Sequence, residues 1–351
     1  MVEHFITNTM SKLYAFILGF ILISCQQSED ASSTFQRITG EAQGTTYNIV
    51  VDTAGLGAIK KQEIDSIFLE IDSSLSVWKE SSIISDFNTA DSIVVSDSHF
   101  LTVYYRSREL YNLTEGAFNI QIAPLVKAWG FGKEGVKPVA KLNPDSLLQW
   151  VHMDIETSVD SLNEAIVFRK QNGQSIDVNG IAQGYTVDVI SDFLKSKSAT
   201  NFMAEVGGEV VAQGTNDEGD KWRIGIDKPV SDLTQREMQA VAEISGKALA
   251  TSGSYRKYYE LDGKKYSHTI DPKSGLPVEH SLLSVSVLTT NCTNADAFAT
   301  AFMVMGKNKT LDFLEKHPEL KLDVYLISGK EDGSLETYAS DGFAIAEKNE
   351  D

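Results

Sequence analysis

A carboxylate and a hydroxyl stand four residues apart in the segment Asn294–Phe302, at Asp296 and Thr300. The apolar residues around them indicate a helix, and positions four apart lie on one face of a helix. A carboxylate buried on such a face is costly unless it is paired or bound to a metal. Carboxylate, hydroxyl and carbonyl oxygens suit Mg²⁺, so the pair is a candidate metal site. The alternative is an N-terminal cap aspartate followed by a threonine that bonds back to its own helix.

The stretch Ser175–Asp188 predicts a strand, a tight turn and a helix. Its first half alternates apolar and polar residues, Gly180 and Gly184 interrupt its middle, and apolar residues then recur at helical spacing. Such a turn offers backbone groups beside the carboxylate of Asp177, and glycines let a phosphorylated ligand approach the backbone. Many turns of this kind carry two glycines only for packing, so the pattern becomes informative only together with other segments.

Two later segments add polar groups. Thr251–Tyr255 is a hydroxyl-rich turn after a predicted strand, and His268 lies between a strand and the turn Asp271–Gly275. A single histidine is more often a hydrogen-bonded structural residue than a catalytic one. The role of His268 therefore depends on the groups that the fold brings near it.

The elements that must position these residues indicate an α+β fold with a largely antiparallel sheet and packed helices. Predicted helices cover 60–75, 99–114 and 143–151. Predicted strands cover 44–51, 165–170, 202–206, 222–229, 237–244 and 248–251, with a further strand around Ser161 and a surface segment at 76–88. We expect a single domain over residues 35–347.

The N-terminal region predicts export and anchoring. Leu13–Ser24 is an apolar run too short for a membrane-spanning helix, which needs about 20 residues, and is typical of a signal peptide. The last residues before Cys25 resemble a bacterial lipobox. We therefore expect a signal peptide at 1–24, lipidation of Cys25, a linker at 25–34 and a location on the periplasmic face of a bacterial membrane. The alternatives are an ordinary signal peptide with a coincidental cysteine and translation from Met10 rather than Met1.

The net charge of −18 argues against a nucleic-acid partner, because phosphate backbones require clustered lysine and arginine. An acidic protein that binds a phosphorylated ligand needs local hydrogen-bond donors or a divalent cation to offset repulsion. Only Cys292 remains once Cys25 carries an anchor, so disulfides do not organise the fold.

Eight segments, in order along nearly the whole chain after the signal, resemble the ApbE family of flavin transferases, also called FAD:protein FMN transferases. The matching segments are Gly44–Tyr47, Ser76–Trp78, Gly116–Asn119, Asp177–Gly184, Val206–Glu209, Thr251–Gly253, His268–Gly275 and Ala295–Thr300. The resemblance implies an extracytoplasmic, often lipid-anchored enzyme with a T-fold-like α+β architecture. Such enzymes split the pyrophosphate of FAD, join FMN through a phosphoester to a Ser or Thr of a partner protein, and release AMP.

The resemblance also implies roles for individual residues. Asp296, Thr300 and the carbonyl of Gly180 would hold Mg²⁺, and His268 would be the general base. The positions implied for the site of the substrate FAD are Gln43, Trp78, Ala117, Phe118, Asn119, Asp177, Gln183 and Ile270.

The chain departs from the common family pattern at four positions. Gln43 stands where Met is usual, Asn119 where Asp is usual and Gln183 where Lys is frequent, so the resemblance does not fix the strength of these three flavin contacts. Ala299 stands where some members have a further carboxylate. The metal would then have one charged ligand, so we expect weak Mg²⁺ affinity in the absence of nucleotide.

Two other functions fit the same fold. Water could replace the protein hydroxyl, giving a metal-dependent FAD pyrophosphatase that yields FMN and AMP, or the chain could be a lipoprotein that only binds flavin. For the transferase, we expect the acceptor to be a separate extracytoplasmic flavoprotein, such as a subunit of a membrane redox complex.

Overall fold

The computed structural model describes residues 34–133, 135–139, 142–229, 237–254, 258–261 and 263–346. The predicted signal peptide, Cys25 and the linker up to residue 33 lie outside the described residues, as does Tyr255. Within the described ranges, no helix combines the length and the apolar character that crossing a bilayer requires.

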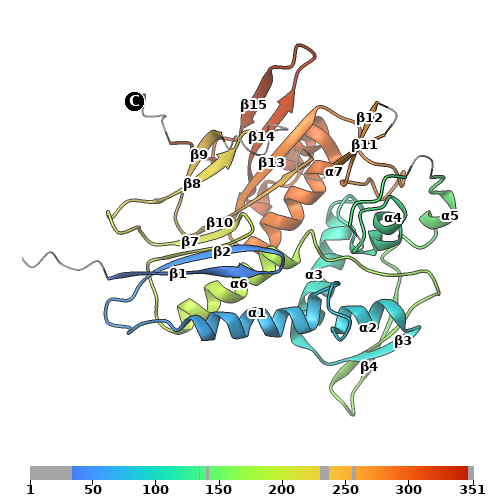
Figure 1. Cartoon of the computed structure of the whole chain (residues 1–351), viewed down its shortest axis with the longest axis horizontal. Coiled ribbons are helices and arrows are strands. Elements are labelled where there is room, and N and C mark those ends of the chain that lie inside the picture. Colours follow the sequence, from blue (N-terminus) through green and yellow to red (C-terminus); the bar gives the residue numbers. More distant parts are fainter. Residues whose placement is uncertain are drawn as a thin grey trace, which may run out of the picture. The chain divides into compact units, whose positions relative to one another are not determined.

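An antiparallel sheet is the centre of the described structure (Figure 1). Its eight strands follow the order β1-β2-β6-β7-β10-β13-β14-β15, and each neighbouring pair is antiparallel. The α+β prediction is confirmed. The strands are β1 (Phe35–Ala42), β2 (Thr45–Asp52), β6 (Phe202–Val206), β7 (Glu209–Gln213), β10 (Lys247–Gly253), β13 (Leu282–Thr289), β14 (Asp323–Gly329) and β15 (Leu335–Ala339).

Helices cover one face of this sheet. The helix α6 (Ala182–Ser196) packs on β6 and β7, α7 (Cys292–Lys316) packs on β10 and β13, and the two helices pack on each other. Outside them, α1 (Lys61–Leu75) contacts α6 and α3 (Ser98–Leu113). The apolar faces of these helices meet the inward-facing residues of the strands in the main hydrophobic core.

The opposite face of the sheet is covered by a hairpin of β8 (Trp222–Asp227) and β9 (Met238–Ile244). Side chains alternate along β10, so Ala248 and Ala250 join the helical core while Leu249 joins a second cluster with Trp222. The sheet is therefore the middle layer between helices and hairpin.

The remaining elements lie around the ends of these layers. A three-stranded sheet has the order β3-β5-β4, and β11 pairs with β12. Their bounds are β3 (Ser92–Val95), β4 (Glu156–Asp160), β5 (Ala165–Arg169), β11 (Tyr258–Leu261) and β12 (Lys264–Ser267). The short helices are α2 (Ile83–Thr89), η1 (Ile120–Ile122), α4 (Ala123–Ala128), α5 (Asp145–Leu148) and η2 (Pro318–Leu320).

A kink divides α7. Gly306 has a φ of +75°, outside the helical region, so the first part of α7 ends there. His280 donates from Nε2 to the carbonyl of Met303 at 2.8 Å, which satisfies one of the carbonyls that a helix end leaves without a partner. Asp296 and Thr300 both lie in the straight part before the kink.

Three local predictions were wrong. The surface segment at 76–88 contains most of α2, which Ser82 caps by accepting from the backbone N–H of Ser85 at 3.2 Å. Residues 175–178 form no strand, because the N–H of Ile176 donates to the side chain of Asn88 and the N–H of Asp177 donates to the carbonyl of Ile120 in η1, rather than to a neighbouring strand. The strand expected around Ser161 is wrong only in position: it is β4, which ends at Asp160, and Ser161 itself begins the turn to β5.

Candidate active site

The N-terminus of α6 meets the first part of α7 at the predicted metal ligands. The N–H of Gly184 donates to Oδ2 of Asp296 at 3.0 Å. A methyl group on Gly184 would lie 2.3 Å from the carbonyl oxygen of Cys292 and 2.7 Å from Cβ of Asp296, so only glycine allows the helices to approach this closely. A methyl group on Gly180 would lie 2.9 Å from Oγ1 of Thr300, which shows that these two residues are neighbours.

The structure brings Asp296, Thr300 and Gly180 together, and we call these three residues the metal corner. Asn291 is the N-cap of α7, so the alternative in which Asp296 caps this helix is wrong. Thr300 lies within 3.4 Å of the hydroxyl of Ser252, at the end of β10. Together with Ser252, the metal corner offers a carboxylate, two hydroxyls and the glycine backbone, from α7, β10 and the turn before α6.

Asp296 is only 6% exposed. Burial raises the pKa of its carboxyl group to about 7, and the hydrogen bond from Gly184 only partly opposes this shift. An ionised carboxylate at this position is therefore costly until a cation compensates its charge.

The donor set fits Mg²⁺. Among the described residues, no group of three or more His, Cys, Asp or Glu side chains could hold a metal. That excludes the ligand sets typical of zinc within these ranges, whereas Mg²⁺ commonly takes one or two carboxylates and completes its shell with water and substrate phosphates. Asp296 and Thr300 would hold it together with the carbonyl of Gly180.

Asp188 fixes the start of α7 from the neighbouring helix α6. Its carboxylate accepts from the backbone N–H groups of Cys292 and Thr293, each at 2.8 Å, and from the hydroxyl of Thr293. Burial raises the pKa of Asp188, and these hydrogen bonds lower it. Asp188 was not predicted as a functional residue, because its polar position on α6 resembles an exposed one and its partners lie about a hundred residues away in the sequence.

The segments predicted to contact flavin lie next to the metal corner. The N–H of Asp177 donates to the carbonyl of Ile120 at 2.7 Å, which joins the stretch before α6 to the loop that contains Phe118 and Asn119. Asp177 also accepts from the N–H of Asn179 at 2.8 Å, so its carboxylate shapes the turn that leads to Gly180.

Asn119 already has two structural partners. Its Oδ1 accepts from the N–H of Gln121 at 2.8 Å, and its Nδ2 donates to the carbonyl of Val151 at 2.9 Å. Ala117, Phe118 and Asn119 are all buried. A ligand contact by Asn119 would therefore use its second carbonyl lone pair, the second hydrogen of Nδ2 or a backbone group.

Gln183, Gln43 and Trp78 lie on the α1 and α6 side of the site. The amide of Gln183 lies against Gly207, since a methyl group there would be 2.8 Å from Nε2. Gln43 donates from Nε2 to the hydroxyl of Thr186 at 3.0 Å, while its Oε1 is buried and has no partner among the described residues. Trp78 is 60% exposed, so it is available to a ligand rather than part of the core.

His268 and Ile270 follow the hairpin of β11 and β12. Ile270 is buried, forms a β-bridge with Pro277 and packs in a small cluster with Trp129 and Val151. The carbonyl of Val151 is also the partner of Asn119, so the predicted base lies on a segment anchored to the flavin-contact loop. His268 is half-buried.

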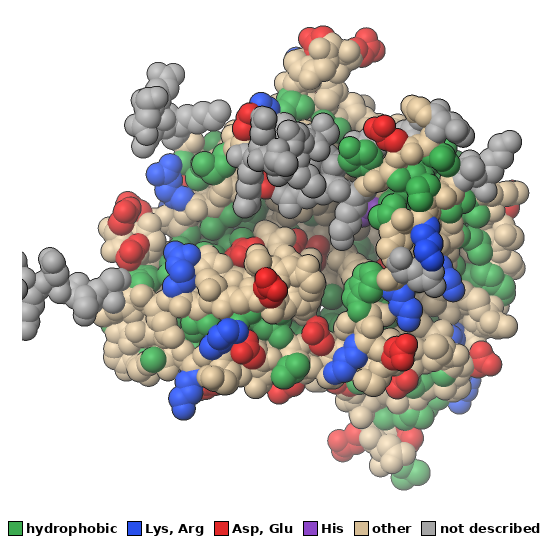
Figure 2. Space-filling view, viewed as in Figure 1, with side chains coloured by type: hydrophobic (Ala, Val, Ile, Leu, Met, Phe, Trp, Pro, Cys, Tyr) green, Lys and Arg blue, Asp and Glu red, His purple; other side chains and the backbone are tan. Residues whose placement is uncertain are grey.

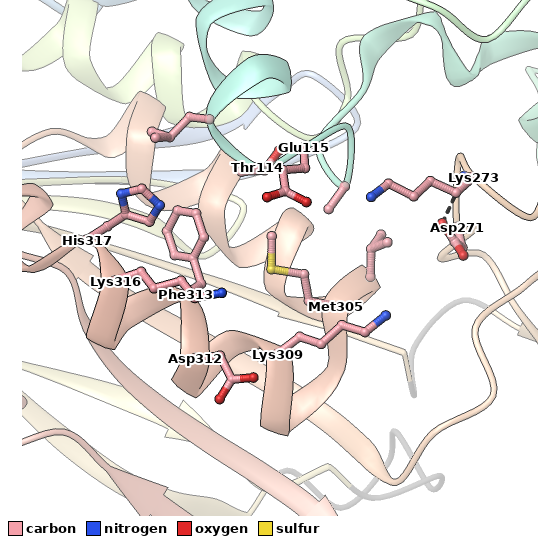
Figure 3. Close-up of a pocket in the computed structure, with 13 residues that line it drawn as sticks. Thr114, Glu115, Asp271, Lys273, Met305, Lys309, Asp312, Phe313, Lys316 and His317 are labelled. Atoms are coloured by element: carbon pink, nitrogen blue, oxygen red, sulfur yellow. Dashed lines mark hydrogen bonds between the residues drawn. The ribbon is translucent and has the colours of Figure 1, made fainter.

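A cavity of about 210 Å³ borders this region (Figure 3). Of the predicted site residues, only Ala117 lines it, and Lys273 and Glu115 extend toward it from opposite sides. Its volume is below the roughly 300–1,000 Å³ of pockets for cofactor-sized ligands, so a dinucleotide cannot be enclosed there. Figure 2 shows a wider hollow near the centre of one face, with acidic side chains along it and histidine at its edge.

Comparison with known proteins decides the family. The model of the ApbE family matches residues 43–325. This chain belongs to the ApbE family. A relative from Vibrio cholerae serotype O1 named FAD:protein FMN transferase is 36% identical over 316 residues, which cover 87% of this chain and 91% of the relative.

Solved ApbE structures are similar to the whole described fold. The flavin transferase ApbE from Vibrio cholerae has a TM-score of 0.73 at 33% identity, covering 88% of this chain and 98% of that one. The apo form of the Pseudomonas stutzeri flavinyl transferase ApbE has a TM-score of 0.76 at 28% identity, covering 88% and 95%. The ApbE resemblance inferred from the eight segments is confirmed.

Proposed function

We propose that this ApbE-family protein transfers FMN from FAD to a Ser or Thr hydroxyl of an acceptor protein, with Mg²⁺, and releases AMP. Relatives named FAD:protein FMN transferase support the flavin transferase activity. The observation that carries the finer proposal is the metal corner, where Asp296 and Thr300 on α7 meet Gly180 in the turn before α6.

The reaction exchanges the phosphoanhydride bond of FAD for a phosphoester bond to the acceptor. The acceptor hydroxyl oxygen attacks the phosphorus of the FMN half of FAD, and the bond from that phosphorus to the bridging oxygen breaks. AMP leaves with the bridging oxygen, and the hydroxyl proton passes to Nδ1 or Nε2 of His268. Proton removal by a positioned base contributes about 10²–10⁴-fold.

Charge neutralisation is the larger requirement, because phosphoryl-type transfer depends mainly on positioning and electrostatics. When bound, Mg²⁺ supplies positive charge to the diphosphate. Asp296 would hold the ion, with Thr300 and the carbonyl of Gly180 as further protein ligands, and Asp177 shapes the turn that leads to Gly180. Asp188 keeps α7 in register with α6, so that the ligands stay together.

The setting of the reaction is also part of the proposal. The lipobox-like residues before Cys25 support a lipid anchor on the periplasmic face of a bacterial membrane. An anchored enzyme would meet extracytoplasmic flavoproteins, such as subunits of membrane redox complexes, as acceptors.

Mass spectrometry of a co-expressed acceptor tests the proposal. The wild-type enzyme with FAD and Mg²⁺ should add one FMN to the acceptor and produce an equal amount of AMP, while Asp296→Ala and His268→Ala should add little. Asp192→Ala, an exposed carboxylate of α6 that pairs with Lys195, is the matched control and should act as wild type. AMP production without flavin on the acceptor would instead indicate a pyrophosphatase, and no AMP at any Mg²⁺ concentration would indicate a flavin-binding protein.

A further inference from the structure

Four aromatic side chains form a stack that ends at His268. Trp129 and Tyr266 stack with ring centroids 5.8 Å apart, Tyr266 and Tyr259 at 5.1 Å, and Tyr259 and Phe131 at 5.3 Å. Phe131 then meets the imidazole of His268 edge-to-face, with centroids 6.3 Å apart and an angle of 69° between the rings. We call Trp129, Tyr266, Tyr259 and Phe131 the aromatic stack.

Two separate elements build this stack. Tyr259 and Tyr266 are a cross-strand pair of the β11–β12 hairpin, which places their rings side by side. Trp129 and Phe131 flank Gly130 at the end of α4. Gly130 has a φ of +76°, and a methyl group there would lie 1.8 Å from the carbonyl oxygen of Lys137, so the reversal between the two aromatic residues requires glycine.

Trp129 anchors the far end of the stack. It is 4% exposed, and its Nε1 donates to the carbonyl of Gly275 at 2.8 Å. Gly275 closes the turn that follows His268 and Ile270, where its N–H donates to the carbonyl of Asp271 at 2.8 Å. The loop after α4 therefore contacts the histidine segment at two places. Phe131 packs against the ring of His268, and Trp129 donates a hydrogen bond to the carbonyl of Gly275.

We propose that Phe131 is a positioning residue that fixes the orientation of the His268 imidazole. This inference rests on the proposed function, in which His268 is the general base. A base must lie within hydrogen-bond reach of the proton that it removes, and a misplacement of about 1 Å can cost about 100-fold in rate. The perpendicular contact with Phe131 limits rotation of the imidazole, and the stack behind Phe131 keeps that ring in place.

Substitution of Phe131 should separate catalysis from binding. Phe131→Leu keeps an apolar side chain but removes the flat ring, so kcat for FMN transfer should fall about tenfold while KM for FAD stays within about twofold. Phe131→Tyr preserves the ring and should restore kcat. Phe343→Leu is the matched control, because Phe343 also stacks on a tyrosine, Tyr325, but lies buried in the cluster between the sheet and the β8–β9 hairpin, whereas Phe131 is half-buried.

A double-mutant cycle in the full-length anchored enzyme tests whether Phe131 acts through His268. In the His268→Ala background, Phe131→Leu should cause no further loss, because the group that it positions is gone. If the two losses multiply, or if Phe131→Leu alone transfers FMN like wild type, the positioning role is wrong. Failure of the proposed function gives a different result, in which His268→Ala itself retains wild-type transfer.

Discussion

At the scale of single residues, Asp296 decides how the site behaves. It is the one carboxylate of the metal corner, and its burial costs free energy whenever it is ionised without a cation. The sequence allowed its helical face and its partner Thr300 to be predicted, because both depend on local periodicity. The pKa shift could not be predicted, because it depends on how deeply α6 and the sheet cover the side chain.

Asp296→Asn should stabilise the metal-free protein at neutral and alkaline pH. The pKa of Asp296 rises from 3.8 to about 7 on folding, so the stability that the group contributes is fully present below about pH 4 and is lost as pH rises toward 7. Above pH 7 the Asn variant should exceed the wild type by up to the order of 4 kcal/mol. Urea unfolding in a chelator at pH 5 and pH 8 measures the difference.

Mg²⁺ provides the control for that measurement. Saturating Mg²⁺ with FAD should stabilise the wild type at pH 8 and leave Asp296→Asn nearly unchanged, because the variant lacks the charged ligand. An Asn variant that is less stable than wild type in chelator at pH 8 would contradict the cost assigned to the buried carboxylate.

At the scale of elements, the site depends on the contact between α6 and α7. Both helices were predicted from apolar spacing, whereas the side chain of Asp188 that joins them and the aromatic stack behind His268 were missed. Those contacts link segments far apart in the sequence, and no local pattern identifies such partners. The stretch at 175–178 was wrongly predicted as a strand, since alternation alone does not show whether a neighbouring strand is available.

Asp188→Ala should weaken both folding and metal binding. It removes the acceptor for two buried N–H groups at the start of α7, so stability should fall by about 2 kcal/mol, and Mg²⁺ affinity in the presence of FAD should fall because Asp296 is less firmly placed. Asp192→Ala, on the same helix, loses only an exposed ion pair and should differ from wild type by less than about 1 kcal/mol. Equal effects of the two substitutions in unfolding and metal titrations would contradict this role.

Gly184→Ala should separate the two helices. The new methyl group would lie 2.3 Å from the backbone of Cys292, so α6 must move away from α7, and we expect a loss of about 2–3 kcal/mol together with a sharp loss of FMN transfer. Gly329→Ala is the control, since its methyl group would meet Leu283 at an ordinary 3.4 Å. Thermal unfolding and transfer assays on both variants measure the difference. A loss in Gly184→Ala alone indicates a steric clash between α6 and α7, whereas equal losses in both variants would indicate a general effect of replacing glycine.

At the scale of the whole molecule, the sequence predicted the α+β class, the antiparallel sheet and the family. It did not reveal the hairpin layer of β8 and β9 over the second face, because a strand pattern does not show which surface it covers. The net charge of −18 remains a property of the whole chain, and it opposes the approach of any diphosphate.

Binding of FAD and Mg²⁺ should therefore be strongly coupled. Mg²⁺ alone should bind weakly, because the site has one charged protein ligand. FAD should bind at least about tenfold more tightly in Mg²⁺ than in NaCl of the same ionic strength. FAD must then raise the affinity for Mg²⁺ by the same factor, because the coupling between two binding equilibria is reciprocal. Calorimetric titration of each ligand with and without the other measures this. Tight Mg²⁺ binding without nucleotide would contradict the one-carboxylate site.

The most direct test is anomalous diffraction from crystals of this protein grown with FAD and Mn²⁺ in place of Mg²⁺. The metal corner predicts one strong peak about 2.1–2.3 Å from a carboxylate oxygen of Asp296, Oγ1 of Thr300 and the carbonyl oxygen of Gly180, next to the diphosphate. A peak bound elsewhere, with these three oxygens contacting only protein, would contradict the account.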